Sequence, residues 1–303
     1  MNQTVLIIDD SPDIHRIIEV RGRDLDVRFV SALDAEEGFA LAASERPDLI
    51  LLDVDLGEGT SGFDLCERLK STPVVRDVPV IFLTGEGQSD SKIRAFDIGA
   101  VDYVVKPFNH GELLARMRSA LRTKHLVDML AECANLDGLT GLRNRRYFDE
   151  RLAQEVETVR RHDCALTLII MDIDKFKTIN DTLGHPRGDQ VIQALGQVIQ
   201  RVGRMTDIPC RLGGDEFVLM LPQTDTPAVE VVAERLCEAV RSDETLNRLV
   251  PNGVTCSVGL ASTSMLEDLS ADALIEAADQ ALYASKRGGR DRWTAYERGR
   301  AAA

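Results

Sequence analysis

The sequence has no long hydrophobic run, no paired cysteine motif and no excess of basic residues. Its apolar runs, such as Ala165–Met171, are far too short to cross a bilayer. The start of the chain, MNQTVLIIDD, has no basic region before its first acids, so we expect no secretory signal, no membrane partner and a cytoplasmic protein. A formal net charge of −14 at pH 7 argues against binding to nucleic acid, which requires a basic surface.

The six cysteines are scattered and include no C-x-x-C pair, which is typical of buried thiols in a reducing compartment and argues against a zinc site. The sequence also lacks a G-x-x-x-x-G-K-[ST] loop. An acidic chain of this kind can handle a nucleotide only with metal ions and a few placed cations. With 303 residues, 44% of them hydrophobic, the chain is long enough for two domains that each bury a core.

The first half of the chain alternates short apolar runs with amphipathic segments. Continuous apolar strands separated by helices predict a doubly wound five-stranded parallel sheet, covered on both faces. The predicted strands are Val5–Ile8, Val27–Val30, Leu49–Leu52, Val78–Leu83 and Val101–Val105.

Polar residues follow these predicted strands, and in a parallel sheet such positions meet at one edge. Asp9 and Asp10 follow the first strand, Asp53 the third, Thr84 the fourth and Lys106 the fifth. Three carboxylates repel one another unless a cation lies among them, and oxygen ligands suit Mg²⁺. Lys106 can pair with an incoming phosphoryl group, to which Thr84 can donate a hydrogen bond.

The segments VLIIDDSP, LILLDVDL, VIFLTG and GAVDYVVKPF resemble the receiver domain of bacterial response regulators. This resemblance implies that Asp53 is the phosphorylation site and takes the phosphoryl group from an upstream histidine kinase. It also implies that Asp10, Asp53 and the backbone carbonyl of Asp55 bind Mg²⁺, with Asp9 in support. The switch residues that it implies are Thr84, Tyr103 and Lys106. A receiver fold with a dead site is the alternative.

The loop after Asp53 departs from the receiver pattern. The family usually has proline four residues after the phosphorylated aspartate and glycine eight residues after it. Here Gly57 and Ser61 hold those positions, and a glycine follows at Gly62, so we expect a loop that is one residue longer. Its effect on the lifetime of the phosphoryl group stays open.

A helical linker is predicted between the two halves, because the stretch from Gly111 to Leu136 has no proline and no further glycine. We interpret it as one continuous helix that leaves the receiver and pairs with its copy in a homodimer. The alternative is a helix that packs only on its own receiver. The apolar positions that support the pairing are Leu114, Met117 and Leu121, then Leu126, Leu130 and Cys133.

The second half contains the hairpin CRLGGDEFVLML, with Gly213–Gly214 expected at its tip. Asp215 and Glu216 beside that tip could be ordinary loop acids. However, the apolar strand ALTLIIMDI brings Asp172 to its end, and acids at adjacent strand ends can share a divalent metal ion. The sequence therefore predicts an α/β domain with a central, mostly antiparallel sheet of the cyclase and polymerase-palm type.

The motifs DGLTGLRNRR, MDIDKFKTINDTLGH, RLGGDEF and ADQALYASKRGGR resemble the GGDEF domain of diguanylate cyclases. The resemblance implies that two GTP become cyclic di-GMP and two diphosphates with Mg²⁺ or Mn²⁺, across the interface of a homodimer or a larger assembly. The residues that it assigns are Asp172, the carbonyl of Ile173 and Asp215 for the metal; Asp215 or Glu216 as base; Lys177, Lys286 and Arg290 for the phosphates, with Lys177 in the catalytic group; Asn180 and Asp189 for guanine; and Gly213 and Gly214 for close approach of the nucleotide. The role of His185 stays open, and Asp291, where the family often has asparagine, is expected to be harmless.

The motif RMTD stands shortly before the hairpin. Its spacing resembles the product-inhibition site of the family, which implies that Arg204, Asp207 and Arg235 bind cyclic di-GMP. A surface ion pair is the alternative.

Together these observations predict a receiver domain at 1–122, a helical linker at 123–136 and a GGDEF domain at 137–303. The expected function is a phosphorylation-regulated diguanylate cyclase. One rival is a non-catalytic effector that binds GTP or cyclic di-GMP, and another is a related cyclase with a different nucleotide product.

Overall fold

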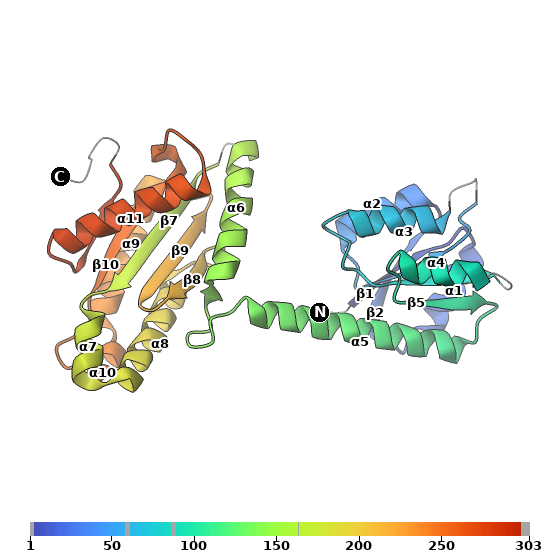
Figure 1. Cartoon of the computed structure of the whole chain (residues 1–303), viewed down its shortest axis with the longest axis horizontal. Coiled ribbons are helices and arrows are strands. Elements are labelled where there is room, and N and C mark those ends of the chain that lie inside the picture. The colour runs from blue at the N-terminus through green and yellow to red at the C-terminus, as the bar shows by residue number, and fades with distance from the viewer. Residues whose placement is uncertain (1–2, 58–60, 86–88, 163, 298–303) are drawn as a thin grey trace. The chain divides into compact units, whose positions relative to one another are not determined.

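The chain divides into two compact units, Met1–Ala131 and Glu132–Ala303. The computed structural model describes residues 3–57, 61–85, 89–162 and 164–297. Each unit has its own sheet (Figure 1) and its own buried hydrophobic clusters. The three predicted domain ranges stay predictions.

The first unit is a parallel sheet of five strands in the order β2-β1-β3-β4-β5, and every neighbouring pair runs parallel. The predicted doubly wound fold is therefore confirmed. Its elements are β1 (Gln3–Ile8), α1 (Pro12–Arg21), β2 (Val27–Ala32), α2 (Ala35–Glu45), β3 (Leu49–Asp53), α3 (Gly62–Ser71), β4 (Val80–Gly85), α4 (Ser89–Asp97), β5 (Asp102–Lys106) and α5 (His110–Ala134).

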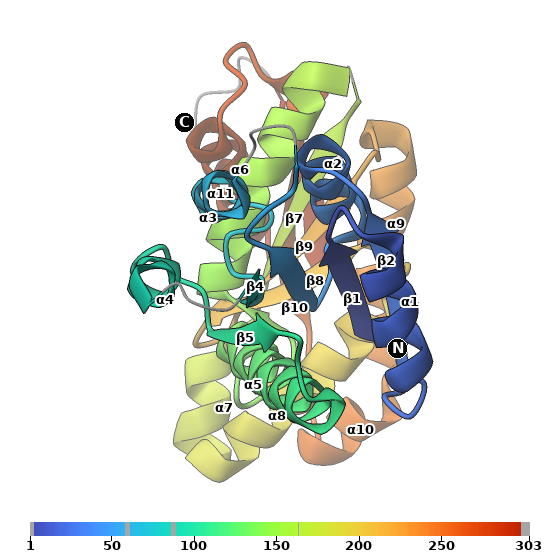
Figure 2. The same cartoon turned by 90° about the vertical axis from the view of Figure 1, so that its right-hand side faces the viewer.

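Side chains of the central strands alternate between two cores, because successive residues of a strand point to opposite faces. Leu6 and Ile8 of β1 pack with residues of α2 and α3, whereas Val5 and Ile7 pack with residues of α1 and α5. Helices α2 and α3 lie on the opposite side of the sheet from α5 (Figure 1 and Figure 2). Burial on both faces explains why the strands are continuous apolar runs in the sequence. Because the buried part of each strand must be apolar, the polar residues lie at the strand ends.

Helix α5 changes character along its length. Leu113, Met117 and Leu121 in its first half are buried against the sheet of the first unit. In its second half the large apolar side chains are exposed, and Leu130 keeps 70% of its surface accessible. The helix is continuous, as predicted, while its pairing with a second copy stays a prediction.

The second unit is a mixed sheet in the order β11-β10-β7-β9-β8-β6. The central pairs β10–β7, β7–β9 and β8–β9 are antiparallel, as predicted, and the outer pairs β10–β11 and β6–β8 are parallel. Its elements are β6 (Arg143–Asn144), α6 (Arg145–His162), β7 (Leu166–Ile173), α7 (Phe176–Leu183), α8 (His185–Val202), β8 (Ile208–Gly213), β9 (Glu216–Pro222), α9 (Thr226–Ser242), α10 (Glu244–Leu249), β10 (Cys256–Ser262), the 3₁₀ turn η1 (Thr263–Met265), α11 (Ala271–Arg287) and β11 (Arg292–Ala295).

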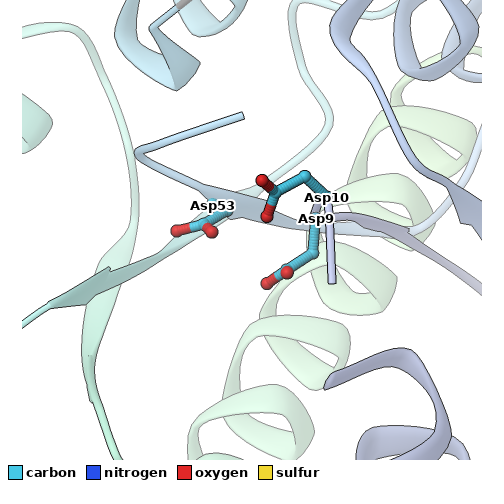
Figure 3. Close-up of side chains that lie close together, drawn as sticks. All are labelled: Asp9, Asp10 and Asp53. Carbon is cyan, nitrogen blue, oxygen red and sulfur yellow. The ribbon is translucent and has the colours of Figure 1, made fainter. Parts of the chain in front are cut away.

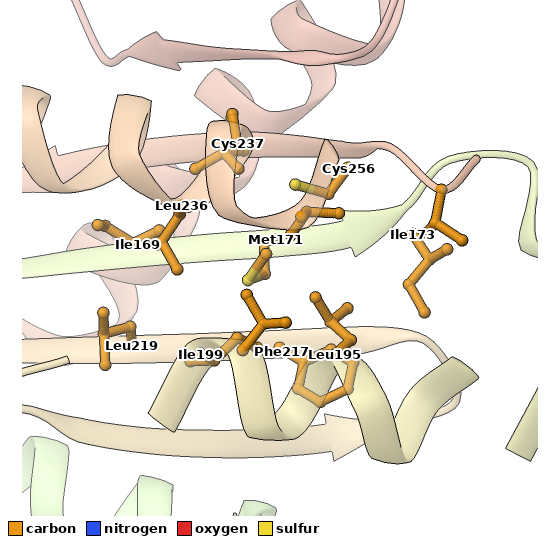
Figure 4. Packing of buried hydrophobic residues seen from close by; sticks show 14 of the residues in the cluster. Ile169, Met171, Ile173, Leu195, Ile199, Phe217, Leu219, Leu236, Cys237 and Cys256 are labelled. Carbon is orange, nitrogen blue, oxygen red and sulfur yellow. The ribbon is translucent and has the colours of Figure 1, made fainter. Parts of the chain in front are cut away.

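Helices cover both faces of this sheet as well. Ile169 and Met171 of β7 pack with residues of α8 and α9 in the larger core (Figure 4), and Leu168 and Ile170 pack with residues of α6 and α11. At Gly259 of β10 an added Cβ would lie 2.1 Å from a backbone nitrogen of α11, so the helix rests directly on the strand backbone. Helix α11, which carries Lys286, is therefore seated on β10, and β10 pairs with β7, which carries Asp172.

Among the residues that the structure describes, none of the helices combines the length and the apolar character that a membrane crossing requires.

Candidate functional site

Three carboxylates meet at the C-terminal edge of the first sheet. Asp9 and Asp10 follow β1, Asp53 ends β3, and one oxygen of each lies within 4.8 Å of the others (Figure 3). Asp9 and Asp53 are buried, and Asp10 is exposed. Oxygen ligands at this spacing, with one side open to water, fit a hard cation such as Mg²⁺.

Lys106 joins two of these acids. Its Nζ lies 2.6 Å from Oδ2 of Asp9 and 2.7 Å from Oδ2 of Asp53. Burial raises the pKa of Asp53 above its usual value, although the hydrogen bond from Lys106 acts in the opposite direction. Burial alone would lower the pKa of Lys106, but its hydrogen bonds to Asp53 and Asp9 raise it. The lysine is thus held charged beside the carboxylate that the sequence predicts to be phosphorylated.

The predicted switch residues lie on β4 and β5. Thr84 is buried, and its hydroxyl donates a 3.3 Å hydrogen bond to the carbonyl of Gly85, which pairs with Lys106. The ring of Tyr103 packs edge-on against Phe96 of α4, with 5.8 Å between the centroids. Thr84 therefore lies at the carboxylate edge, whereas a coupled movement of Thr84 and Tyr103 stays a prediction.

The glycine after the phosphoacceptor loop packs on the backbone of Asp53. The N–H of Gly62 donates to the carbonyl of Val54 at 2.8 Å, and an added Cβ at Gly62 would lie 1.9 Å from the carbonyl oxygen of Asp53. Asp55 forms an isolated bridge with Ser61. Residues 58–60 of the longer loop that we predicted lie outside the described residues. Although Gly62 comes one residue later than the glycine of the receiver pattern, its backbone packs directly on the backbone of Asp53.

The acids of the second site lie at one end of the central strands. Asp172 of β7 is the register partner of Glu216 of β9, and Asp215 lies in the turn just before it. Gly213 and Gly214 have φ values of +140° and +55°, which side-chain-bearing residues rarely adopt. Gly213 still pairs with Glu216 after an irregularity in β8, so the turn consists of Gly214 and Asp215 rather than of the two glycines that we expected.

Asp172 forms an ion pair with Lys286 and is repelled by the carboxylate of Asp215. Its Oδ2 accepts an ion pair from Lys286 at 2.8 Å. Burial raises the pKa of Asp172, Lys286 opposes this rise, and the charge of Asp215 adds to it. Ile173 pairs with Cys256 in the sheet, so its carbonyl is held at the same strand end. The oxygens of Asp172, Asp215 and the Ile173 carbonyl fit a divalent cation, because such an ion would relieve the repulsion between the two carboxylates.

Arg211 supports the glycine turn in a way that sequence reasoning missed. Its guanidinium donates to the carbonyl of Gly214 at 2.8 Å and to both oxygens of Asp137, at 2.9 and 3.0 Å. Burial acts to raise the pKa of Asp137, but hydrogen bonds from Thr140 and Arg211 outweigh it, and the pKa is lowered. The pair joins residues 74 positions apart, so no local pattern in the sequence predicts it.

Asn180 and Asp189, the predicted guanine-binding pair, come from α7 and the start of α8. The Oδ1 atom of Asn180 is buried and has no hydrogen-bond partner among the described residues. An added Cβ at Gly188 would lie 1.9 Å from this oxygen, so the glycine leaves room for it. Asp189 is exposed. A buried acceptor without a donor is the kind of group that a bound ligand satisfies.

The remaining predicted substrate residues are solvent-facing. The side chains of Lys177 on α7 and His185 at the start of α8 are exposed. Arg290, also exposed, follows α11 in the turn that leads to β11, and has a φ of +64°. Lys286 is thus in direct contact with Asp172, while Lys177 and Arg290 have the freedom to approach a phosphate.

The residues predicted for product inhibition gather near the end of α8. Asp207 is buried, and its Oδ2 accepts a 2.7 Å hydrogen bond from the N–H of Arg204. Arg235 of α9 donates to the carbonyl of Val202 at 2.7 Å. The guanidinium of Arg204 is exposed and is not engaged by Asp207, so the surface ion pair considered above is absent from this part of the described structure.

The family described as diguanylate cyclase, GGDEF domain, matches residues 134–292, and the response regulator receiver domain matches residues 5–118. The chain therefore belongs to the GGDEF domain family and carries a receiver domain ahead of it.

Two curated relatives match the chain to different extents. Response regulator PleD of Caulobacter vibrioides is 30% identical over 303 residues, which cover 95% of this chain and 64% of PleD. Diguanylate cyclase DgcP of Pseudomonas aeruginosa is 41% identical over 168 residues, which cover 55% of this chain and 25% of DgcP. The chain thus spans slightly less than two thirds of the length of PleD.

Solved structures support the fold of the second unit. The coiled coil and GGDEF domain of DgcB from Caulobacter crescentus, in complex with c-di-GMP, aligns with a TM-score of 0.56 at 34% identity. The alignment covers 61% of this chain and 97% of that structure.

Proposed function

We propose that this protein is a phosphorylation-regulated diguanylate cyclase that joins two GTP into cyclic di-GMP and releases two diphosphates. The observation that carries the proposal is the cluster at the second sheet: Asp172 opposite Glu216, beside a glycine turn and paired with Lys286. Curated relatives named diguanylate cyclases match the same part of the chain.

In this proposal Asp172, the carbonyl of Ile173 and Asp215 hold Mg²⁺ or Mn²⁺. The ion would neutralise the triphosphate and lower the pKa of the attacking 3′-hydroxyl. Asp215 or Glu216 accepts the proton of that hydroxyl. The 3′-oxygen then forms a bond to the α-phosphorus of the second GTP, and the bond from that phosphorus to the diphosphate oxygen breaks. The same displacement by the 3′-oxygen of the second GTP on the α-phosphorus of the first closes the ring and releases the second diphosphate.

The remaining side chains bind and orient GTP. Lys286 is already at the metal-binding edge, and Lys177 and Arg290 would add positive charge around the phosphates. Asn180 and Asp189 present oxygen acceptors, which match the ring and exocyclic N–H groups of guanine. The unpartnered Oδ1 of Asn180 supports this assignment. Because each subunit would hold one GTP, the reaction requires two subunits face to face, which gives the effective concentration that a two-substrate reaction needs.

The receiver supplies the control in this proposal. Asp53 attacks the phosphorus of a phosphohistidine on a kinase, the phosphorus–nitrogen bond breaks, and an aspartyl phosphate forms. Asp10, Asp53 and the carbonyl of Asp55, with Asp9 in support, would hold the Mg²⁺ that neutralises the phosphoryl group. Lys106 would then leave one of its acids and pair with the phosphate. Product inhibition by cyclic di-GMP at Arg204, Asp207 and Arg235 completes the proposal.

GTP turnover with the product identified by mass tests the catalytic part. We expect cyclic di-GMP from wild type, a loss of at least 100-fold in Asp172→Asn and Asp215→Asn, and no change in Asp272→Asn, an exposed acid on α11. Binding of GTP without turnover would instead support the non-catalytic effector. A mixture of ATP and GTP that gives a hybrid or a cyclic mononucleotide would support the cyclase with a different product.

The regulatory part is tested separately. A small phosphoryl donor such as acetyl phosphate is expected to raise turnover in wild type and to have no effect in Asp53→Asn. Equal rates with and without the donor would refute phosphorylation control but leave the cyclase proposal intact. Arg204→Ala is expected to abolish inhibition of initial rates by added cyclic di-GMP, while a variant that is inhibited as strongly as wild type contradicts the inhibitory site.

A further inference from the structure

The turn that carries Arg290 has an unusual backbone. After α11 ends, Gly289, Arg290 and Asp291 have φ values of +112°, +64° and +47° in succession. Glycine tolerates this conformation, but two consecutive residues with side chains do so only when their surroundings impose it. The neighbours of Asp291 therefore determine where Arg290 lies.

The buried carboxylate of Asp174 is the first of these neighbours. It lies just after β7, and its Oδ2 accepts a 2.9 Å hydrogen bond from the N–H of Asp291 and a 2.7 Å bond from the hydroxyl of Thr255. Its Oδ1 accepts a 2.6 Å bond from the hydroxyl of Ser257. Ser257 pairs through its backbone with Asp172 on one side and Arg292 on the other. Asp174 thus ties the ends of β7, β10 and β11 together.

Arg241 of α9 holds the same turn from the other side. Its Nε donates to Oδ1 of Asp291 at 2.7 Å, and its terminal nitrogen donates to the carbonyl of Asp291 at 3.1 Å. The hydrogen bond with Asp291 raises the pKa of the guanidinium. The aspartate at 291, which stands where the family often has asparagine, is therefore half of an ion pair in this chain.

These contacts connect the metal-binding strand to the turn that carries the phosphate-binding arginine. Asp172 and Asp174 are two residues apart at the same strand end; Asp172 holds Lys286, and Asp174 holds the backbone beside Arg290. We infer that Asp174, with the Arg241–Asp291 pair, is a positioning element that sets Arg290 for the phosphates of GTP. This inference rests on the proposed function, since it presumes that Arg290 contacts GTP.

The test is a double-mutant cycle on the full-length protein, read by the KM for GTP, by kcat and by the dissociation constant of a non-hydrolysable GTP analogue with Mg²⁺. Asp174→Asn keeps the shape of the side chain but lacks one carboxylate oxygen and the charge. We expect about a tenfold higher KM and a similar weakening of analogue binding, with kcat changed less than about threefold, because ground-state binding is what a misplaced Arg290 loses. In an Arg290→Ala background the same substitution should have almost no further effect.

A second arm keeps the test decisive if Asp174→Asn folds poorly. Arg241→Gln changes a half-exposed side chain and should raise the KM about threefold, again only when Arg290 is present. Asp225→Asn is the matched control: this acid accepts hydrogen bonds from the hydroxyls of Ser262 and Ser264 at the opposite end of β10, and its loss should leave the KM unchanged.

The outcomes separate the inference from the proposed function. If wild type binds no analogue and turns over no GTP, the proposed function fails. If wild type is active but the effects of Asp174→Asn and Arg241→Gln are the same with and without Arg290, or appear only in thermal stability, the residues are merely structural and the inference is refuted.

Discussion

Replacing Gly62 with alanine would create a steric clash with the backbone of β3, at the carbonyl oxygen of Asp53. The added Cβ would lie 1.9 Å from the carbonyl oxygen of Asp53, whereas real Cβ contacts are not shorter than 3.0 Å. Relief of the clash therefore requires a movement of 3.0 − 1.9 = 1.1 Å. Because the contacted atom belongs to the backbone of a buried strand, no side chain can rotate away, and the movement would also strain the 2.8 Å hydrogen bond from Gly62 to Val54.

We expect this substitution to lower the free energy of unfolding of the first unit by about 3 kcal/mol, the upper end of the usual cost of overpacking. With a urea m-value of about 2 kcal/mol per M for a unit of this size, the midpoint should fall by about 1.5 M. The single tryptophan, Trp293, lies in β11 of the second unit. Its fluorescence transition should not move, while the far-ultraviolet circular dichroism transition of the first unit should.

Gly85→Ala is the matched control, since no atom of the described residues lies within 4 Å of a Cβ added there. Its midpoint should change by less than about 0.3 M. A Gly62→Ala midpoint within that same range would refute the claim that this glycine packs on Asp53. Labelling of Asp53 by acetyl phosphate, measured by intact mass, should slow in Gly62→Ala and not in the control.

Three further outcomes follow from contacts in the second unit. Gly259→Ala would place a Cβ 2.1 Å from the backbone nitrogen of Leu282, so we expect a loss of about 3 kcal/mol in the Trp293-monitored urea transition; a loss below 1 kcal/mol would contradict the direct seating of α11 on β10. Gly188→Ala would displace the Oδ1 of Asn180 and should raise the KM for GTP about tenfold, whereas Gly138→Ala, which meets no atom within 4 Å, should not change it. Arg211→Met should cost about 2 kcal/mol at pH 7 by removing a charged hydrogen-bond pair. Since the pKa of Asp137 is lowered in the folded state, its stabilising contribution is present above the unfolded value of 3.8 and is lost as pH falls through the folded pKa. The difference between wild type and Arg211→Met should therefore shrink below about pH 4, and a pH-independent difference would speak against the ion pair.

Much of the fold could be read from local patterns. The first sheet was predictable because strands buried on both faces must be apolar along their length, as β3 is from Leu49 to Leu52. The positions of the acids were predictable because they lie at, or directly beside, the ends of strands. The conformation of the glycine turn was harder, since an irregularity within β8 moves the turn by one residue to Gly214–Asp215, and no local pattern in the sequence marks it.

The supporting contacts could not be predicted, because they join residues that are distant in the chain. Asp174 reaches Asp291 across 117 positions, and Arg211 reaches Asp137 across 74. Each of these residues, taken alone, is an ordinary charged residue near a turn. Their roles depend on which strand ends become neighbours, and therefore on the order of strands in the sheet.

The change along α5, from a half that is buried against a sheet to a half that is exposed, limits how its length can vary. Each residue of an α-helix adds about 1.5 Å and about 100° of rotation. One residue inserted between Leu121 and Leu126 would turn the exposed Leu130 by roughly a quarter of a circle relative to Leu121, whereas seven would return it to within about 20°. Working lengths of this connection should therefore differ by about seven or about eleven residues rather than by one.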